Sequence, residues 1–242
     1  MGAPSLTPRL AIEGVWKAFG RRPVLRNASV WAYAGDVTVL FGRNGEGKST
    51  LLRCGLGLLR SDAGVTIVQG ERTRRASLGV LARAGLFFLP DRDLLASHCA
   101  IRRQFGALAA RFPGALEAAV LEGLTDPTML DRPPEDLSGG ERRMTELAFA
   151  EARRPTVLIA DEPLRELTPR NAEDLAERLR AIARRGCAVL VTGHETRALL
   201  AIADHVVWMT GGTTHHLGDR DAALAHALFR RHYLSHQQPT MP

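Results

Sequence analysis

Short apolar runs alternate along the chain with longer stretches in which hydrophobic residues recur every three or four positions. Runs of consecutive apolar residues predict buried strands over 36–41, 65–69, 156–160, 187–192 and 205–209. Helical periodicity predicts helices over 49–59, 140–153, 171–185 and 196–203. Strands and helices that alternate in this way indicate a parallel sheet covered by helices on both faces.

Two parts of the chain depart from this alternation. Weak period-two patterns over 9–17 and 25–33 predict short strands before the first helix, and Gly211-Gly212 suits a hairpin turn near the end. Residues 92–138 are instead rich in Ala, Arg and Leu.

The 92–138 stretch predicts a small helical subdomain inserted into the α/β body. Helical periodicity extends over 98–111 and 115–124, with Pro113-Gly114 between the two, and 131–136 is predicted as a loop. We therefore expect one domain over 1–242, with this insertion and a polar, frayed tail over 235–242.

Composition is typical of a globular chain and excludes several classes. Of the 242 residues, 45% are hydrophobic and 24% charged, which argues against a coiled coil, collagen or extensive disorder. No apolar run approaches the roughly 18–20 residues of a membrane-spanning helix, and residues 1–8 lack the layout of a secretory signal. The expected compartment is the cytoplasm, with any membrane contact made through a partner.

Charge and cysteines change this picture little. The net charge is +6, but the arginines are scattered in pairs such as Arg21-Arg22 rather than gathered in a stripe with aromatic residues. Solvated helix faces explain them better than a nucleic-acid interface, so no nucleic acid is expected. The three cysteines form no CxxC pair and are expected to be packing residues.

A glycine-rich segment between the strand at 36–41 and the following helix is a candidate phosphate-binding loop. It matches G-x4-G-K-[ST] through Gly42, Arg43, Asn44, Gly45, Glu46, Gly47, Lys48, Ser49 and Thr50. Glycines let successive backbone N–H groups point at phosphates, and the helix start adds partial positive charge. Lys48 would reach the outer phosphates and the Ser49 hydroxyl would bind Mg²⁺.

Lysine usage supports this interpretation of Lys48. Lysine occurs only at Lys17 and Lys48, in a chain with 32 lysines and arginines together. A sequence that almost always uses arginine but keeps lysine in this loop indicates a chemical constraint, because the two side chains are not interchangeable at a phosphate site.

Two acids end the apolar strand at 156–160. Asp161 is placed to hold Mg²⁺, and Glu162 to orient or activate a water against a terminal phosphate. The alternative is that both acids merely cap a strand at its solvent edge. The phosphate-binding loop elsewhere in the chain favours the functional interpretation.

The segment Leu137-Ser-Gly-Gly-Glu141 precedes a predicted helix. Ser138 and Glu141 have the spacing of a capping box, which explains those two residues by helix stability alone. It does not explain Gly139 and Gly140, which weaken a helix start. Consecutive glycines there suit the close approach of an anion to the backbone.

LSGGE, GRNGEGKST and LIADEP together, in this order and over essentially the whole chain, resemble the ATP-binding-cassette family. The resemblance implies an α/β P-loop NTPase fold with a mostly parallel core sheet, an N-terminal antiparallel β subdomain and an inserted helical subdomain. It also implies ATP and Mg²⁺ as cofactors. Two cassettes would enclose ATP head to tail, with Ser138, Gly139, Gly140 and Glu141 acting on the nucleotide of the other cassette.

Further positions match the family. Phe19 resembles the aromatic residue that stacks on adenine, although a core aromatic is the alternative, and His194 resembles the switch histidine at the γ-phosphate. The expected partners are a second cassette and transmembrane permease subunits, with the chain peripheral on the inner membrane face. The 230–234 segment faintly resembles the C-terminus of cassettes that serve lipopolysaccharide export or branched-chain amino acid uptake.

Three positions depart from the family pattern. Asp91 stands where the family usually has Gln, Thr168 where it has Asp, and Glu46 is unusual in the phosphate loop. Asp91 would still offer Mg²⁺ an oxygen ligand. Thr168 would cap the helix that Pro169 begins. We expect these changes to lower ATP turnover in the isolated chain without preventing nucleotide binding.

The leading hypothesis is an ATPase subunit that couples ATP-driven dimer closure to solute movement. A weakly hydrolysing cassette that regulates a more active partner is the alternative, favoured by Asp91 and Thr168 but opposed by Glu162 and His194. A cassette acting on nucleic acid or ribosomes, or a kinase of another P-loop family, fits less well, because the former usually has two cassettes or a coiled-coil insertion and the latter needs no LSGGE.

Overall fold

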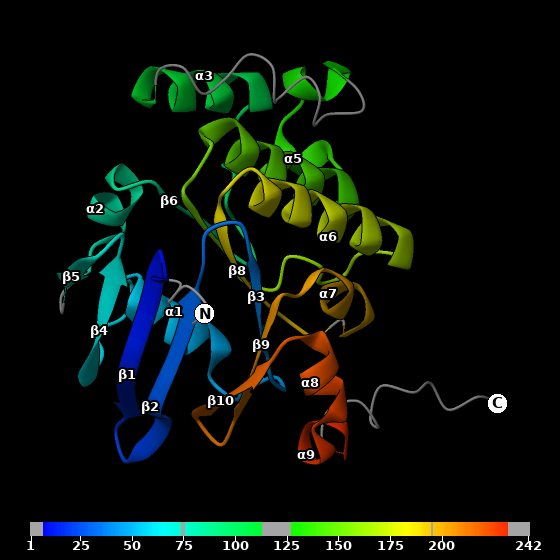
Figure 1. Cartoon of the computed structure of the whole chain (residues 1–242). Helices are drawn as coiled ribbons and strands as arrows, with labels where there is room; N and C mark the ends of the chain where they lie inside the picture. The colour runs from blue at the N-terminus through cyan, green and yellow to red at the C-terminus, as the bar shows by residue number, and fades with distance from the viewer. Residues whose placement is uncertain (1–6, 74–75, 113–126, 195, 232–242) are drawn as a thin grey trace.

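The computed structural model describes residues 7–73, 76–112, 127–194 and 196–231, and the chain forms two β-sheets with helices packed around them (Figure 1). Among these residues no helix combines the length and apolar character needed to cross a bilayer. The predicted helix at 115–124 and tail at 235–242 lie outside the described residues.

The larger sheet is the parallel sheet that the sequence predicts. Its strand order is β10-β9-β3-β8-β7-β6, and every pairing is parallel except that of the edge hairpin β9–β10. The strands are β3 (Val37–Phe41), β6 (Leu86–Leu89), β7 (Val157–Ala160), β8 (Ala188–Gly193), β9 (His205–Thr210) and β10 (Thr213–Gly218).

The smaller sheet is antiparallel and has the order β2-β1-β4-β5. Its strands are β1 (Leu10–Phe19), β2 (Arg22–Ala32), β4 (Ala63–Val68) and β5 (Glu71–Thr73). Half of these strands come from beyond the first helix, so the sheet is completed by residues outside the N-terminal segment. The predicted fold class, a mostly parallel core with an antiparallel β sheet beside it, is confirmed.

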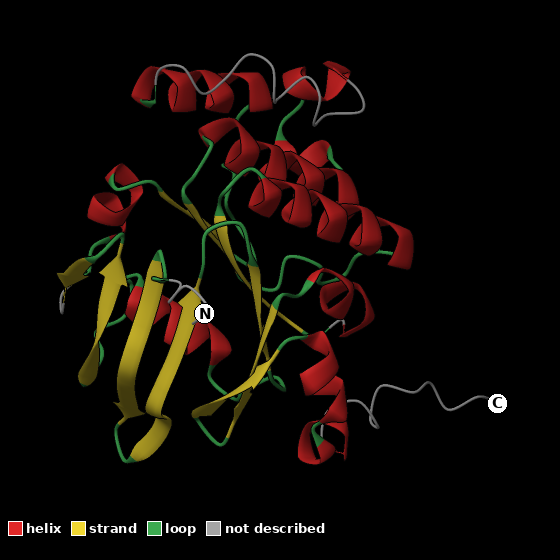
Figure 2. Cartoon of the chain, viewed as in Figure 1, coloured by secondary structure: helices red, strands yellow, loops and turns green. Residues whose placement is uncertain are grey.

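Helices lie on both sides of the parallel sheet (Figure 2). They are α1 (Lys48–Gly55), α2 (Leu78–Arg83), α3 (Ile101–Arg111), α5 (Gly139–Arg153), α6 (Pro169–Arg184), α7 (Thr196–Ile202), α8 (Arg220–Ala225) and α9 (Ala227–Phe229), with 3₁₀ turns at Pro127–Asp131 and Pro134–Asp136. The prediction of a plain loop over 131–136 was therefore wrong in part, because Pro134 starts a short turn of helix. α3 also begins three residues later than predicted.

Strand β3 shows why the sheet is buried on both faces. Val39 and Phe41 pack in one core with residues of α6 and α7. Leu40 points the other way, into a second core that holds Leu51 of α1 and Ile12 of the antiparallel sheet. Alternate side chains of one apolar strand thus serve two cores, which is the pattern of a strand covered on both sides.

A third core joins α3 to α5, the helix that follows the LSGGE segment. The rings of Phe105 and Phe149 stack with centroids 3.7 Å apart, and Ile101 and Leu130 are buried in the same cluster. Because these contacts fix the helical insertion to α5, they also fix the position of the helix start at Gly139.

A buried arginine of α5 connects this helix to the ends of two strands. Arg143 donates to the carbonyl oxygens of Pro90, Asp161 and Pro163, which follow β6 and β7, over 2.7–3.2 Å. It also donates to the Glu146 carboxylate at 2.7 Å. A guanidinium has five donors in a fixed plane, so one side chain can hold several segments in register.

We expect Arg143→Ala to lower the free energy of unfolding by about 3 kcal/mol, because it leaves Glu146 buried without its cation and three carbonyl groups without a donor. Urea unfolding followed by circular dichroism measures the change. Arg142→Ala, on the exposed face of the same helix, is the matched control and is expected to change stability by less than about 0.5 kcal/mol. Equal effects of the two substitutions would contradict this assignment.

Candidate nucleotide-binding site

The 42–50 segment forms a tight loop between β3 and α1, as predicted. Gly45 has φ 85° and Gly47 φ 109°, conformations that side chains rarely adopt. Gly42 has no room for a side chain, since a Cβ there would lie 2.9 Å from the carbonyl oxygen of Met209. The loop conformation therefore depends on glycine at each of these three positions.

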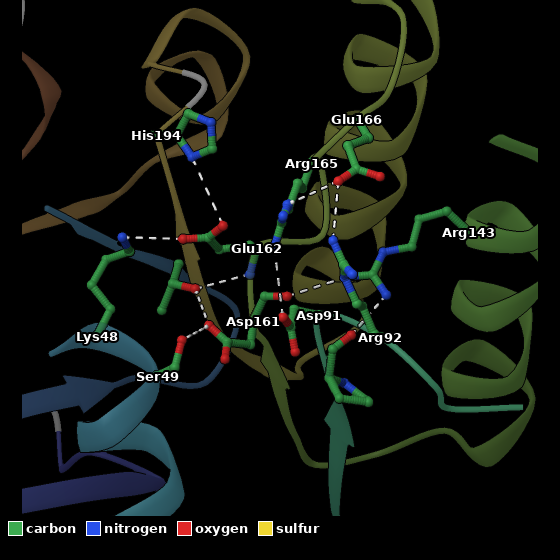
Figure 3. A network of polar contacts seen from close by, with 12 residues as sticks. Lys48, Ser49, Asp91, Arg92, Arg143, Asp161, Glu162, Arg165, Glu166 and His194 are labelled. Carbon is green, nitrogen blue, oxygen red and sulfur yellow. Dashed lines mark hydrogen bonds and ion pairs between the residues drawn. The ribbon is translucent and has the colours of Figure 1, made fainter. Parts of the chain in front are cut away.

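Lys48, at the start of α1, is buried and its ammonium is turned into the loop (Figure 3). It donates to the carbonyl oxygen of Gly42 at 2.8 Å and lies 3.2 Å from Glu162 Oε1. A flexible ammonium that is surrounded by acceptors is ready to exchange them for phosphate oxygens.

Asp161, directly after β7, is fully buried beside the loop. Its Oδ1 accepts from Thr192 Oγ1 at 2.7 Å and from Ser49 Oγ at 3.2 Å, whereas Oδ2 has no hydrogen-bond partner among the described residues. Burial raises the pKa of Asp161, and the hydrogen bonds from Thr192 and Ser49 oppose the shift.

Glu162 lies next to Lys48 and faces His194 across the loop end of β8. The distance from Glu162 Oε2 to His194 Nδ1 is 3.9 Å, and the Glu162 backbone N–H donates to Thr192 Oγ1 at 2.9 Å. The φ of Glu162 is 45°, a left-handed conformation that is uncommon for this residue type. Backbone strain of this kind is concentrated at functional positions.

A cavity of about 280 Å³ lies where these elements meet. Of the predicted residues, Asn44, Gly45, Gly47, Lys48, Ser49, Thr50, Asp91 and Glu162 line it, whereas Asp161 and His194 are not among its lining residues. Several oxygen ligands and one ammonium at a helix start form a site suited to a polyphosphate and a hard cation.

Phe19 and the LSGGE segment are not among the residues that line this cavity. Phe19 ends β1 and is 50% exposed, so the alternative of a core aromatic is excluded. It lies on the hairpin whose second strand supplies Val24 and Leu25, the residues packed against Gly47 of the loop. The exposed ring has Lys17 Nζ 5.3 Å from its centroid.

Ser138 and Glu141 form the capping box that their spacing predicts, with both reciprocal hydrogen bonds present. The two glycines between them differ in the space that a side chain would find. A Cβ on Gly140 would lie 2.6 Å from Asn171 Nδ2 of α6, so the Asn171 amide would have to shift to admit a side chain there. Gly139 has open space around it, and contacts within the described chain do not account for its lack of a side chain.

The three departures from the family pattern each make a definite contact. Thr168 caps α6 by accepting from the Asn171 N–H at 3.3 Å. Glu46 accepts from the Gly211 N–H at 2.6 Å and so connects the phosphate loop to the β9–β10 hairpin. Asp91 lies about 4 Å from the guanidinium groups of Arg53 and Arg165.

Sequence reasoning missed three residues of the site. Thr192 binds both Asp161 and the backbone of Glu162, Arg143 holds the segments after β6 and β7, and Arg165 lines the cavity. The signal for Thr192 was a hydroxyl at the end of a buried strand beside the strand of Asp161. The two arginines had no such signal in an arginine-rich chain.

The sequence comparisons identify the class. The family model for ABC transporters matches residues 25–165. A probable ABC transporter ATP-binding protein of Azorhizobium caulinodans is 31% identical over 234 residues, which cover 94% of this chain and 83% of that protein. The lipopolysaccharide export system ATP-binding protein LptB of Acidithiobacillus ferridurans is 28% identical over 94% of this chain and 97% of its own length.

Comparison with solved structures agrees on the fold. A nucleotide-free ATP-binding cassette from an ABC transporter superposes with a TM-score of 0.79 at 22% identity and covers 96% of each chain. The chain therefore belongs to the ABC transporter family, in which it is an ATP-binding and ATP-hydrolysing subunit.

The buried carboxyl of Asp161 gives the protein without nucleotide a stability that depends on pH. Because the pKa is raised above its ordinary value of 3.8, the folded chain holds this proton more tightly than the unfolded chain. The free energy of unfolding contributed by this group therefore falls as pH rises above about 4. Asp161→Asn removes the effect.

We expect Asp161→Asn to raise the free energy of unfolding at pH 7 without nucleotide, and the gain to shrink towards pH 4. Urea unfolding at several pH values measures it. Asp174→Asn, at an exposed position of α6, is the control and is expected to change stability at pH 7 by less than about 0.5 kcal/mol. A gain for Asp161→Asn that is independent of pH would contradict the assignment.

Proposed function

We propose that this chain binds ATP with Mg²⁺ at the cavity of residues 42–49, 161 and 162, and that its hydrolysis powers the movement of a solute by a membrane partner. The observation that supports this is the convergence of Lys48, Ser49 and Glu162 on one cavity at the start of α1, with Asp161 buried beside it. The position of each group suits one part of phosphoryl transfer to water.

Lys48 and Glu162 have linked roles in this proposal. When a triphosphate enters, Lys48 exchanges the Gly42 carbonyl and the Glu162 carboxylate for phosphate oxygens. Glu162 is then free to orient and deprotonate the attacking water, and His194 lies on the same side to contact the terminal phosphate. Backbone N–H groups of the loop, from Gly42 to Thr50, hold the remaining phosphate oxygens.

Ser49 and Asp161 fit a Mg²⁺ ion. Asp161 Oδ2 is buried without a hydrogen-bond donor, and a hard cation with its water ligands would satisfy it while Ser49 Oγ adds a direct oxygen ligand. The ion would draw negative charge from the phosphates. Asp91, the third predicted metal residue, lines the same cavity but faces two arginines, so we assign Mg²⁺ to Ser49 and Asp161.

We expect Glu162→Gln to lower ATP turnover by at least about 100-fold while nucleotide binding persists, since it removes the base but keeps the shape of the side chain. Lys48→Ala is expected to lose binding itself. Phosphate release and titration with a fluorescent ATP analogue measure the two effects. Glu173→Gln, an exposed change on α6, is the control. Unchanged turnover in Glu162→Gln would refute the catalytic role.

We further propose that Ser138, Gly139, Gly140 and Glu141 close over the nucleotide of a second cassette. Gly139 supports this, because its open surroundings leave room for a phosphate group or the backbone of another chain. The start of a 15-residue helix also offers free N–H groups and positive potential to an anion.

We expect Gly139→Asp to abolish the ATP-dependent dimer that the Glu162→Gln background accumulates. The added carboxylate occupies the anion position, yet an acid in the first turn of a helix does not destabilise the fold. Size-exclusion chromatography with MgATP measures dimer formation. Gly106→Asp, another glycine in open space, is the control, and a dimer that survives in Gly139→Asp would contradict the trans role.

The membrane partner in this proposal is a permease subunit that docks on exposed apolar side chains. Leu58 and Val80 are each more than half exposed. Leu58 directly follows Gly57 and Val80 follows Ala76 by four residues, and Gly57 packs against Ala76. Such an attachment would place the chain at the inner membrane face.

The alternative of a weakly hydrolysing regulatory cassette is not favoured. Such cassettes would be expected to lose Glu162 and His194. Both are present here, with Glu162 beside Lys48 and His194 facing Glu162. The changes at Asp91 and Thr168 are instead accommodated by specific contacts. We still expect turnover in the isolated chain to be low.

A further inference from the structure

A row of alternating charges crosses the rim of the nucleotide cavity. Arg53 lies 4.0 Å from Asp91, Asp91 lies 3.9 Å from Arg165, and Arg165 lies 3.2 Å from Glu166. Glu166 in turn accepts from Arg92 at 3.2 Å. The row joins α1, the segment after β6 and the loop after β7. Figure 3 shows its members Asp91, Arg92, Arg165 and Glu166.

Arg165 is the member of this row closest to the proposed chemistry. Its backbone N–H donates to the Glu162 carbonyl oxygen at 3.2 Å, so the chain turns back and brings Arg165 beside Glu162. Arg165 lines the cavity together with Lys48 and Glu162. In the view of Figure 3, Lys48 and Arg165 lie on opposite sides of Glu162.

The contacts of Arg165 suit a ligand of higher negative charge than its present partners. Its distance to Asp91, 3.9 Å, is at the limit of an ion pair, and 38% of its side chain is exposed. A guanidinium presents paired N–H groups that match phosphate oxygens. The terminal phosphate of ATP would offer several such oxygens beside Glu162.

Resting on the proposed function, we propose that Arg165 is a second cation of the phosphate site, which contacts the terminal phosphate of bound ATP from the side opposite Lys48. Asp91 and Glu166 are positioning residues that hold the guanidinium at the rim until the nucleotide arrives. Asp91 thus restrains an arginine instead of binding Mg²⁺. The unusual acid and the arginine form one functional pair.

If Arg165 contacts the terminal phosphate, its loss weakens binding of ATP more than binding of ADP, which has no such phosphate. We expect Arg165→Gln to weaken binding of the β,γ-imido analogue of ATP about tenfold and binding of ADP less than twofold, both with Mg²⁺. Arg165→Lys is expected to recover part of the loss because it keeps the charge. Isothermal titration of the unmodified full chain and the two variants with each nucleotide measures the six affinities.

Two further substitutions separate this role from a structural one. Arg92→Gln removes a cation from the same row, but Arg92 is not among the residues that line the cavity, and the ratio of the two affinities is expected to stay as in the unmodified chain. Asp91→Asn releases Arg165 and is expected to tighten binding of the ATP analogue two- to fivefold. The gain is expected to vanish when Arg165→Gln is added, since the two sites are coupled.

The outcomes distinguish this inference from the proposed function. If the unmodified chain binds neither nucleotide, the proposed function itself fails. If the unmodified chain binds both nucleotides, and Arg165→Gln leaves the ratio of the affinities for the ATP analogue and ADP unchanged, only the role of Arg165 is overturned. Weaker binding of the ATP analogue in Asp91→Asn would overturn the positioning role of Asp91 and favour a metal ligand there.

Discussion

The nucleotide site depends on one buried guanidinium. Arg143 is the only described side chain that donates at once to the carbonyl groups of Pro90, Asp161 and Pro163. These carbonyls belong to segments that end two neighbouring strands and carry the acids of the cavity. Because Arg143 sits on the helix that starts at Gly139, its hydrogen bonds link the proposed contact surface for a second cassette to the segments around the nucleotide cavity. A shift of that helix would have to move both.

The positive side chains at the cavity are paired with acidic side chains, and the proposed mechanism exchanges these acids for phosphate groups. Lys48 faces Glu162, Arg165 faces Asp91, and Asp161 keeps one oxygen without a donor. Lys48 and Arg165 are thus each paired with an acid, which a phosphate replaces in the proposed mechanism. Asp161 Oδ2, which has no donor among the described residues, would bind the cation. Burial strengthens the Lys48–Glu162 pair in a low-dielectric site, whereas the Arg165–Asp91 pair is partly exposed and weaker.

The fold and most of the site could be predicted because their signals are local. Apolar strands, the glycine loop and the two acids after 156–160 each carry a short pattern, and the capping box at Ser138 formed as its spacing required. Residues that act over long sequence separations could not be predicted. The reach of Arg143 to Pro90, and of Arg165 to Asp91, depends on tertiary packing that no spacing encodes. The start of α3 at Ile101 was missed because the Gln104 side chain binds the backbone of Ala96 and Cys99 and so holds the residues before Ile101 outside the helix.

The hydrogen bond between Glu46 and Gly211 links two regions proposed to contact opposite ends of a nucleotide. Through it the phosphate loop is attached to the β9–β10 hairpin, and β10 in turn contacts β2 where Thr214 accepts from the Ser29 N–H. The strand β2 forms the hairpin with the strand that ends in Phe19. The phosphate loop and the hairpin that carries Phe19 are therefore both tied by hydrogen bonds to the β9–β10 hairpin, which sets the spacing between the proposed phosphate and base contacts.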